Sequence, residues 1–140
     1  MLLRTTNRVP ELADIPAFMP VRDDTLRRIE RRFERRSFDA NDVVIAEGTR
    51  GDEVFIIVSG QAVVDRCGGE IATLGPGDWF GELAVLLDLP RNATVRALTP
   101  LHVFALSRAS FFALLLDVPD LWRRLAAILA RRLRQADLAA

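Results

Sequence analysis

The chain of 140 residues is poor in the residue types from which disulfides and metal centres are built. It contains one cysteine, Cys67, and one histidine, His102. A single cysteine cannot form an internal disulfide, so nothing indicates an oxidising compartment. Zinc sites need several His or Cys ligands, so we expect no metal and no catalytic nucleophile that depends on histidine. We expect His102 to be an ordinary strand residue.

Long apolar segments and a net charge are also missing. Uninterrupted apolar runs such as 83–87 are far shorter than the roughly 20 residues of a membrane span. The formal charge is zero, from 19 basic and 19 acidic residues, so no global field favours nucleic acid or a membrane surface. No signal peptide is visible at residues 1–4. We expect one cytoplasmic domain over residues 1–140, or a cytoplasmic piece of a larger protein.

Glycine is present, but all eight glycines lie between Gly48 and Gly81. This window is the turn-rich, β-rich part of the chain. It predicts a mainly β fold with flanking helices (α+β), an antiparallel jelly roll or β-roll over 43–106 with one short helix at 81–87. The strands are predicted at 43–46, 54–58, 61–66, 71–74, 93–97 and 102–106.

Helices are predicted before the roll. An N-terminal helical segment spans 10–36, with a short helical piece at 11–18. Asp23 or Asp24 is expected to cap its main helix, which runs to about Arg36 because apolar residues recur at helical spacing.

Two further helices are predicted at 107–137. Ser107 is expected to cap the first, and Pro119 to open the second, which runs to about Asp137. The last helix carries an apolar stripe that must be covered by the roll or by a second copy. The stripe consists of Leu121, Trp122, Leu125, Ile128, Leu129 and Leu133.

The most informative segment is Phe80-Gly81-Glu82-Leu83-Ala84-Val85, followed after five residues by Arg91-Asn92-Ala93-Thr94-Val95. A helix start presents backbone N–H groups and a dipole that favour an anion. Arg91 supplies the matching charge, and Glu82 suits a hydroxyl donor. The implied ligand carries a phosphate and a sugar hydroxyl. Taken separately, the pieces also fit a plain turn and a surface ion pair.

Residues 44–60 and 74–82 together resemble the cyclic-nucleotide-binding domain family. The first stretch has Gly48, Gly51 and Gly60 at the family's turn positions around an apolar strand. The second, Leu-Gly-Pro-Gly-Asp-Trp-Phe-Gly-Glu, runs into the family's phosphate-binding cassette at 80–95. The resemblance covers roughly residues 15–135 and implies a β-roll with this cassette and a C-terminal helix that closes over the base.

The resemblance implies that Arg91 binds the cyclic phosphate and that Glu82 binds the ribose 2′-hydroxyl. Asn92 stands where the family usually has Ser, Thr or Ala, so the base preference stays open. The expected ligand-binding residues are Gly81, Glu82, Leu83, Ala84, Arg91, Asn92 and Ala93. The apolar wall under base and ribose is assigned to Val64, Ile71 and Leu74, with a purely structural core as the alternative.

The function implied by the resemblance is that of a ligand sensor and not an enzyme. Its ligand is cAMP, with cGMP as the alternative, and no cofactor or metal is expected. Binding is passed through the last helix to an effector such as a channel, transporter or enzyme; a homodimer is possible, but direct contact with nucleic acid or membrane insertion is not expected. The alternatives are the sensor half of a cAMP-receptor-type transcription regulator and a degenerate domain that serves assembly only.

Overall fold

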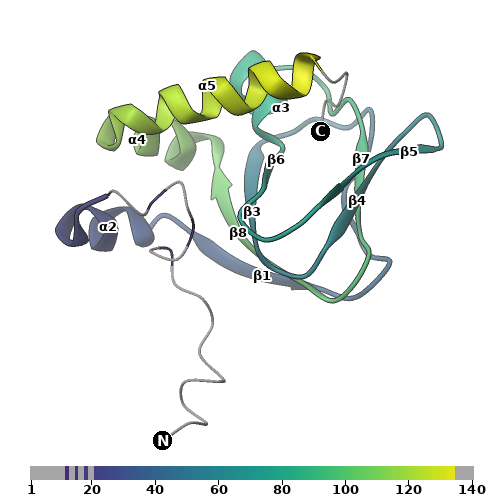
Figure 1. Ribbon diagram of the computed structural model, residues 1–140, viewed down its shortest axis with the longest axis horizontal. Helices are drawn as coiled ribbons and strands as arrows, with labels where there is room; N and C mark the ends of the chain where they lie inside the picture. The colour runs from purple at the N-terminus through teal and green to yellow at the C-terminus, as the bar shows by residue number, and fades with distance from the viewer. Residues whose placement is uncertain (1–11, 13–14, 16–17, 19–20, 135–140) are drawn as a thin grey trace, which may run out of the picture.

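The protein folds into antiparallel strands with helices outside them (Figure 1). The computed structural model describes Leu12, Ile15, Phe18 and residues 21–134. In chain order the elements are α2 (Asp23–Glu30), β1 (Glu34–Phe38), β2 (Val43–Ile45), β3 (Glu53–Ser59), β4 (Ala62–Arg66), β5 (Gly69–Leu74), β6 (Trp79–Phe80), α3 (Glu82–Leu87), β7 (Thr94–Ala97), β8 (Leu101–Ser107), α4 (Arg108–Asp117) and α5 (Pro119–Arg134).

The strands form two facing four-stranded sheets, ordered β1-β8-β3-β6 and β2-β7-β4-β5. Every strand pairing is antiparallel. The predicted fold class is therefore confirmed. Each of the six predicted strands is found, with its ends within two residues of the prediction. The structure adds β1 and the two-residue β6.

The predicted helix up to Arg36 is wrong. Helix α2 ends at Glu30, and Arg36 lies in β1, where it pairs with Val103 of β8. The pairing joins segments about 70 residues apart, so no local periodicity reveals it. Neither Asp23 nor Asp24 is the N-cap; both lie in the first turn, where their charges favour the helix dipole. Of the short piece predicted at 11–18, only Leu12, Ile15 and Phe18 lie within the described residues, and all three are buried.

Strand β3 separates two apolar cores. Alternate residues of a strand point to opposite faces, so Phe55 and Ile57 join the cluster between the sheets, while Val54 and Ile56 join the cluster under the helices. Both faces are covered, which explains the unbroken apolar run of this strand. Between the sheets, Phe55 stacks on Phe80 with ring centroids 5.1 Å apart.

The C-terminal helices cover the outer face of the β1-β8-β3-β6 sheet. The Ser107 side chain caps α4 by accepting a hydrogen bond from the Ser110 N–H at 3.2 Å, as predicted. Helix α5 begins at Pro119, and its Leu121 and Leu125 are buried in the cluster under the helices. Trp122 stays half exposed. Leu121 and Leu125 are thus covered within the chain itself, in the cluster that the helices share with the sheet. No helix in the described part of the chain has the length and hydropathy of a membrane span.

Gly60 and Gly68 offer a matched test of packing at left-handed positions, with φ of 92° and 83°. A Cβ atom on Gly60 would lie 2.2 Å from the Pro100 carbonyl oxygen, but one on Gly68 would meet nothing within 4 Å. Each alanine substitution should cost about 1–2 kcal/mol of backbone strain. Because of the clash, we expect Gly60→Ala to lower the free energy of unfolding by a further ~1–3 kcal/mol. Urea denaturation of both variants measures the difference. Equal losses in the two variants would contradict this account.

Candidate functional site

The predicted cassette lies at the junction of β6, α3 and β7. Gly81 adopts a left-handed conformation with φ of 87°, which turns the chain from β6 into α3. A Cβ atom there would lie 2.8 Å from Nη1 of Arg91 and 3.0 Å from the Glu53 carbonyl oxygen. Glycine is therefore required both for the turn and for the close approach of Arg91.

Arg91 is folded inward and ties three segments together. Its Nη1 donates to the Gly81 carbonyl at 2.9 Å, and its Nη2 donates to the Glu53 carbonyl at 2.8 Å. Its backbone N–H donates to the Thr49 carbonyl, and its own carbonyl accepts from the Gly48 N–H, both at 2.8 Å. The side chain thus spans β3 and the start of α3, while its backbone fixes the 48–49 turn.

Glu82 and Arg91 are the only charged side chains within the described residues that are buried, with exposed fractions of 1% and 5%. Burial lowers the pKa of Arg91, while the nearby negative charges of Glu53, Asp52 and Glu82 act in the opposite direction. Burying charged groups is costly, and well-packed apolar residues often stabilise a fold at least as well as a buried charged pair. An arrangement of this kind is typical of a site for a charged ligand.

Gly51 provides the space that Arg91 occupies. A Cβ atom on Gly51 would lie 2.3 Å from Nε and 2.4 Å from Cζ of Arg91. Gly51 is buried in the turn between β2 and β3. The sequence marked this glycine only as a turn residue, whereas the structure gives it a second role beside the guanidinium.

The other predicted cassette residues lie around this pair. Ala84 and Ala93 are buried, and Leu83 is half-buried. The Asn92 carbonyl accepts from Nε of Arg66 at 3.3 Å. The side-chain oxygen Oδ1 of Asn92 is buried without a hydrogen-bond partner, which is the state expected of a polar atom whose partner is a ligand.

The three residues assigned to the apolar wall are not brought together. Val64 and Leu74 are buried in the cluster between the sheets. Ile71 is outside it and 37% exposed. The reason is a β-bulge: Val64 pairs with Ala72 and the next residue, Asp65, pairs with Glu70, so Ile71 is the extra residue of β5.

Arg108, at the first position of α4, is a site-forming residue that the sequence reasoning missed. Its Nη1 donates to the Val85 carbonyl of α3 at 2.8 Å, and its Nη2 contacts the Gly51 carbonyl and Asp88 Oδ1, both at 3.3 Å. It therefore connects α4 to the cassette helix and to the turn that contains Gly51. A basic residue in the first turn opposes the helix dipole, and this was the one local signal of a special role.

A hollow of about 270 Å³ borders Arg91. Arg91 is the only predicted site residue that lines it. The other lining residues come from β2, the following turn and β3: Val44, Ile45, Ala46, Thr49, Arg50, Asp52, Glu53 and Phe55. Across the described residues, no group of three or more His, Cys, Asp or Glu side chains is placed to hold a metal ion.

Comparison with known proteins identifies the family of this chain. The family model described as "Cyclic nucleotide-binding domain" matches residues 35–117. This range includes both sheets except Glu34, and the whole cassette with Glu82 and Arg91.

Individual relatives agree with the family match. The chain is 36% identical to the cyclic AMP receptor protein of Thermus thermophilus over 111 residues, which are 76% of this chain and 51% of the relative. It is 49% identical to a cAMP-dependent protein kinase regulatory subunit of Yarrowia lipolytica over 79 residues, 55% of this chain and 21% of the relative. The chain thus spans about half of the first protein and about a fifth of the second.

A solved structure described as "Sp-2Cl-cAMPS bound to PKAR CBD2" superposes with a TM-score of 0.76 and 29% identity. The superposition covers 92% of this chain and 88% of that one. The likeness therefore extends beyond the cassette to the roll and its helices.

The close approach of Gly51 and Arg91 generates a prediction. We expect Gly51→Ala to lower the free energy of unfolding by about 1–3 kcal/mol, because the new methyl group takes the place of the guanidinium. In an Arg91→Ala background the same change should cost much less, since the side chain that it would meet is absent. Chemical denaturation of the four proteins in this cycle measures the coupling.

The control is Gly75→Ala, where a Cβ atom would meet nothing within 4 Å. It should leave stability nearly unchanged in both backgrounds. Additive effects of the Gly51 and Arg91 substitutions would show that the two positions do not compete for space.

Proposed function

Because the chain belongs to the cyclic nucleotide-binding domain family, we propose that it is a non-catalytic sensor that binds cAMP at residues 80–95. The observation that carries the proposal is the joint burial of Glu82 and Arg91 beside Gly81. A cyclic nucleotide needs one cation for its phosphate and one acceptor for its ribose hydroxyl, and this pair supplies both.

Arg91 is proposed to bind the cyclic phosphate. Its guanidinium now donates to two neutral carbonyls, those of Gly81 and Glu53. A phosphate anion would form charge-assisted, bidentate hydrogen bonds, which are roughly twice as strong as bonds to neutral acceptors. Burial keeps these bonds from being screened by solvent. The backbone N–H groups of Leu83, Ala84 and Ala93 would complete the phosphate shell.

Glu82 is proposed to accept a hydrogen bond from the ribose 2′-hydroxyl. An ionised carboxylate is only an acceptor, so it suits a hydroxyl and would repel the phosphate. Its place at the first position of α3 puts it one residue from Gly81, on the same short segment as the phosphate site.

The proposed base preference is cAMP over cGMP. The names of the relatives refer to cyclic AMP and to cAMP-dependent kinases. Asn92 is the residue that leaves the base preference open, since its side-chain oxygen is buried without a hydrogen-bond partner. Val64 and Leu74 would form the apolar wall under base and ribose, and the exposed Ile71 would not take part.

Signal output is proposed to pass through α4 and α5. Arg108 fastens the start of α4 to the cassette helix and to the Gly51 turn, so a ligand that moves α3 also acts on α4. A ligand shifts such an equilibrium only by binding the two arrangements unequally. The effector lies outside this sequence, and a channel, transporter or enzyme in the cytoplasm remains the first choice.

A second candidate is the sensor half of a transcription regulator. It is favoured by the match to a CRP-like cAMP-activated global transcriptional regulator of Mycobacterium tuberculosis, which is 28% identical over 131 residues, 58% of the relative. Both candidates bind the same ligand in the same way. They differ in the effector that the sensor controls and in whether the sensor pairs with a second copy.

We expect Arg91→Leu to weaken cAMP binding by roughly ten- to a hundred-fold, since hydrogen bonds to charged groups contribute about 1.5–3 kcal/mol. Calorimetric titration with cAMP and cGMP measures the loss. Arg96→Leu is the matched control, because Arg96 is a half-buried arginine that pairs with Asp65 outside the cassette. If both variants bind as the wild type does, the phosphate assignment fails. If the wild-type protein bound neither nucleotide, the alternative of a degenerate domain that serves assembly only would be favoured.

Glu82→Ala should weaken binding of cAMP but hardly change binding of its 2′-deoxy analogue. The analogue lacks the hydroxyl that the carboxylate is proposed to accept from, so the wild type and the variant should bind it alike. Competition against a fluorescent cyclic nucleotide measures both ligands. The ribose role is refuted by equal losses for the two.

Asn92→Thr should raise the affinity for cGMP relative to cAMP if position 92 faces the base, because it places at this position the hydroxyl that Ser and Thr supply in the family. The measurement is the ratio of the two dissociation constants, because an equal change in both constants leaves the selectivity unchanged. An unchanged ratio would place Asn92 away from the base.

A further inference from the structure

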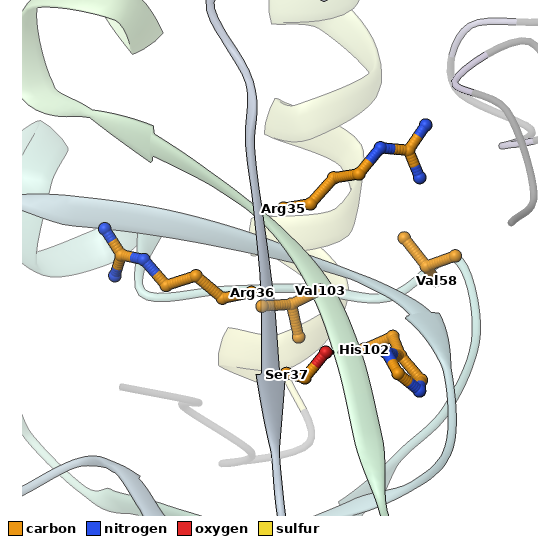
Figure 2. A pocket seen from close by; sticks show the side chains of 6 residues that line it. All are labelled: Arg35, Arg36, Ser37, Val58, His102 and Val103. Atoms are coloured by element: carbon orange, nitrogen blue, oxygen red, sulfur yellow. Dashed lines mark hydrogen bonds between the residues drawn. The ribbon is translucent and has the colours of Figure 1, made fainter.

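A second hollow, of about 210 Å³, lies apart from the cassette (Figure 2). It is formed at the outer face of the β1-β8-β3-β6 sheet, and none of the cassette residues lines it. Its lining residues are Arg35, Arg36, Ser37, Val58, His102 and Val103. They include three basic residues and no carboxylate.

Arg35 and Arg36 are consecutive residues of β1, so their side chains point to opposite faces of the sheet. Figure 2 shows Arg35 on the same side as Val58 and His102, and Arg36 pointing away from them. Arg36 is neutralised by Glu53 and Glu34, with a hydrogen bond of 2.8 Å from its Nη1 to Glu53 Oε1. Arg35 therefore supplies the positive charge on the face of the hollow.

Arg35 is held in place without being neutralised. Its guanidinium carbon lies 5.0 Å from the centroid of the Phe104 ring, which is its partner across the strands. No carboxylate pairs with Arg35 in the described part of the chain. A cation–π contact fixes the guanidinium while leaving its N–H groups available to an anion.

Ser37 and His102 provide further donors beside it. They face each other across β1 and β8, and the Ser37 hydroxyl lies 2.9 Å from Nδ1 of His102. If the Ser37 hydroxyl donates to Nδ1, the Nε2–H of the imidazole can donate to another group. If Nδ1–H donates to the hydroxyl oxygen, the hydroxyl hydrogen can donate to another group. In either tautomer the pair offers one donor to a third group.

An irregularity in β3 shapes the apolar side of the hollow. Ile57 pairs with Val103 and Ser59 pairs with His102, so Val58 is an extra residue in β3. A β-bulge of this kind redirects a side chain and bends the strand. Val58 is 9% exposed, and it presents an apolar surface next to the donors of Ser37 and His102.

We propose that this hollow binds a small organic anion, whose carboxylate or phosphate group is held by Arg35 and the Ser37–His102 pair and whose apolar part rests on Val58. The site is separate from the cassette and does not depend on the proposed nucleotide binding. Its volume of about 210 Å³ admits a molecule of a few heavy atoms beyond the anionic group.

His102 makes the site directly observable, because it is the only histidine of the chain. Its imidazole signals in an NMR spectrum of the full chain need no assignment. The probes are inorganic phosphate and phenyl phosphate, titrated at fixed pH and with ionic strength held constant by chloride. We expect a saturable shift of the His102 signals and tighter binding of phenyl phosphate, because its ring can pack on Val58.

Arg35→Gln should weaken this binding by roughly ten-fold or more. Arg27→Gln, an exposed arginine of α2, is the matched control and should bind as the wild type does. Arg91→Leu should also keep the His102 shift, which separates this site from phosphate binding at the cassette. A linear shift without saturation, equal weakening in the two glutamine variants, or loss of the shift in Arg91→Leu would each overturn the proposal.

Discussion

The burial of the Arg91 guanidinium is the constraint on which the rest of the site depends. A buried cation must be surrounded by acceptors, and here the carbonyls of Gly81 and Glu53 take this role. Those two carbonyls lie just beyond the paired residues of β3 and β6, so the guanidinium joins the two segments where their strand pairing ends. Gly51 and Gly81 lack side chains at the points where the guanidinium lies against the backbone. The cassette is thus built around one arginine, and its glycines follow from that arginine's position.

The roll supplies a rigid frame for this arrangement because β3 serves two cores at once. Its alternating residues are buried both between the sheets and beneath the helices. A movement of α4 and α5 over the sheet therefore changes the packing against β3. The first residue of β3, Glu53, provides a carbonyl to Arg91. Arg108 adds a direct connection from α4 to the cassette helix. The C-terminal helices and the candidate ligand site thus contact the same strand and the same cassette helix, so a change in one can alter the other.

The sequence predicted the local features well and the long-range ones poorly. The Phe-Gly-Glu segment, the short helix and the arginine after Pro90 all depend on neighbouring residues, and they lie where they were expected. Strand β1 depends on pairing with β8, and it was mistaken for the end of a helix. The exposure of Ile71 follows from a bulge that only the strand register reveals. The contacts of Arg108 join residues up to 57 positions apart, beyond the reach of any local pattern.

The hairpin of β4 and β5 has a practical consequence for spectroscopy. Cys67 lies at its turn with φ of 52°, is exposed, and is the only thiol of the chain. The neighbouring Arg66 donates to the carbonyl of Asn92 in the cassette. A maleimide dye would therefore attach at one place without any engineering of other cysteines. Its emission would report on the solvent around the cassette, so this chain carries its own attachment point for a fluorescent biosensor.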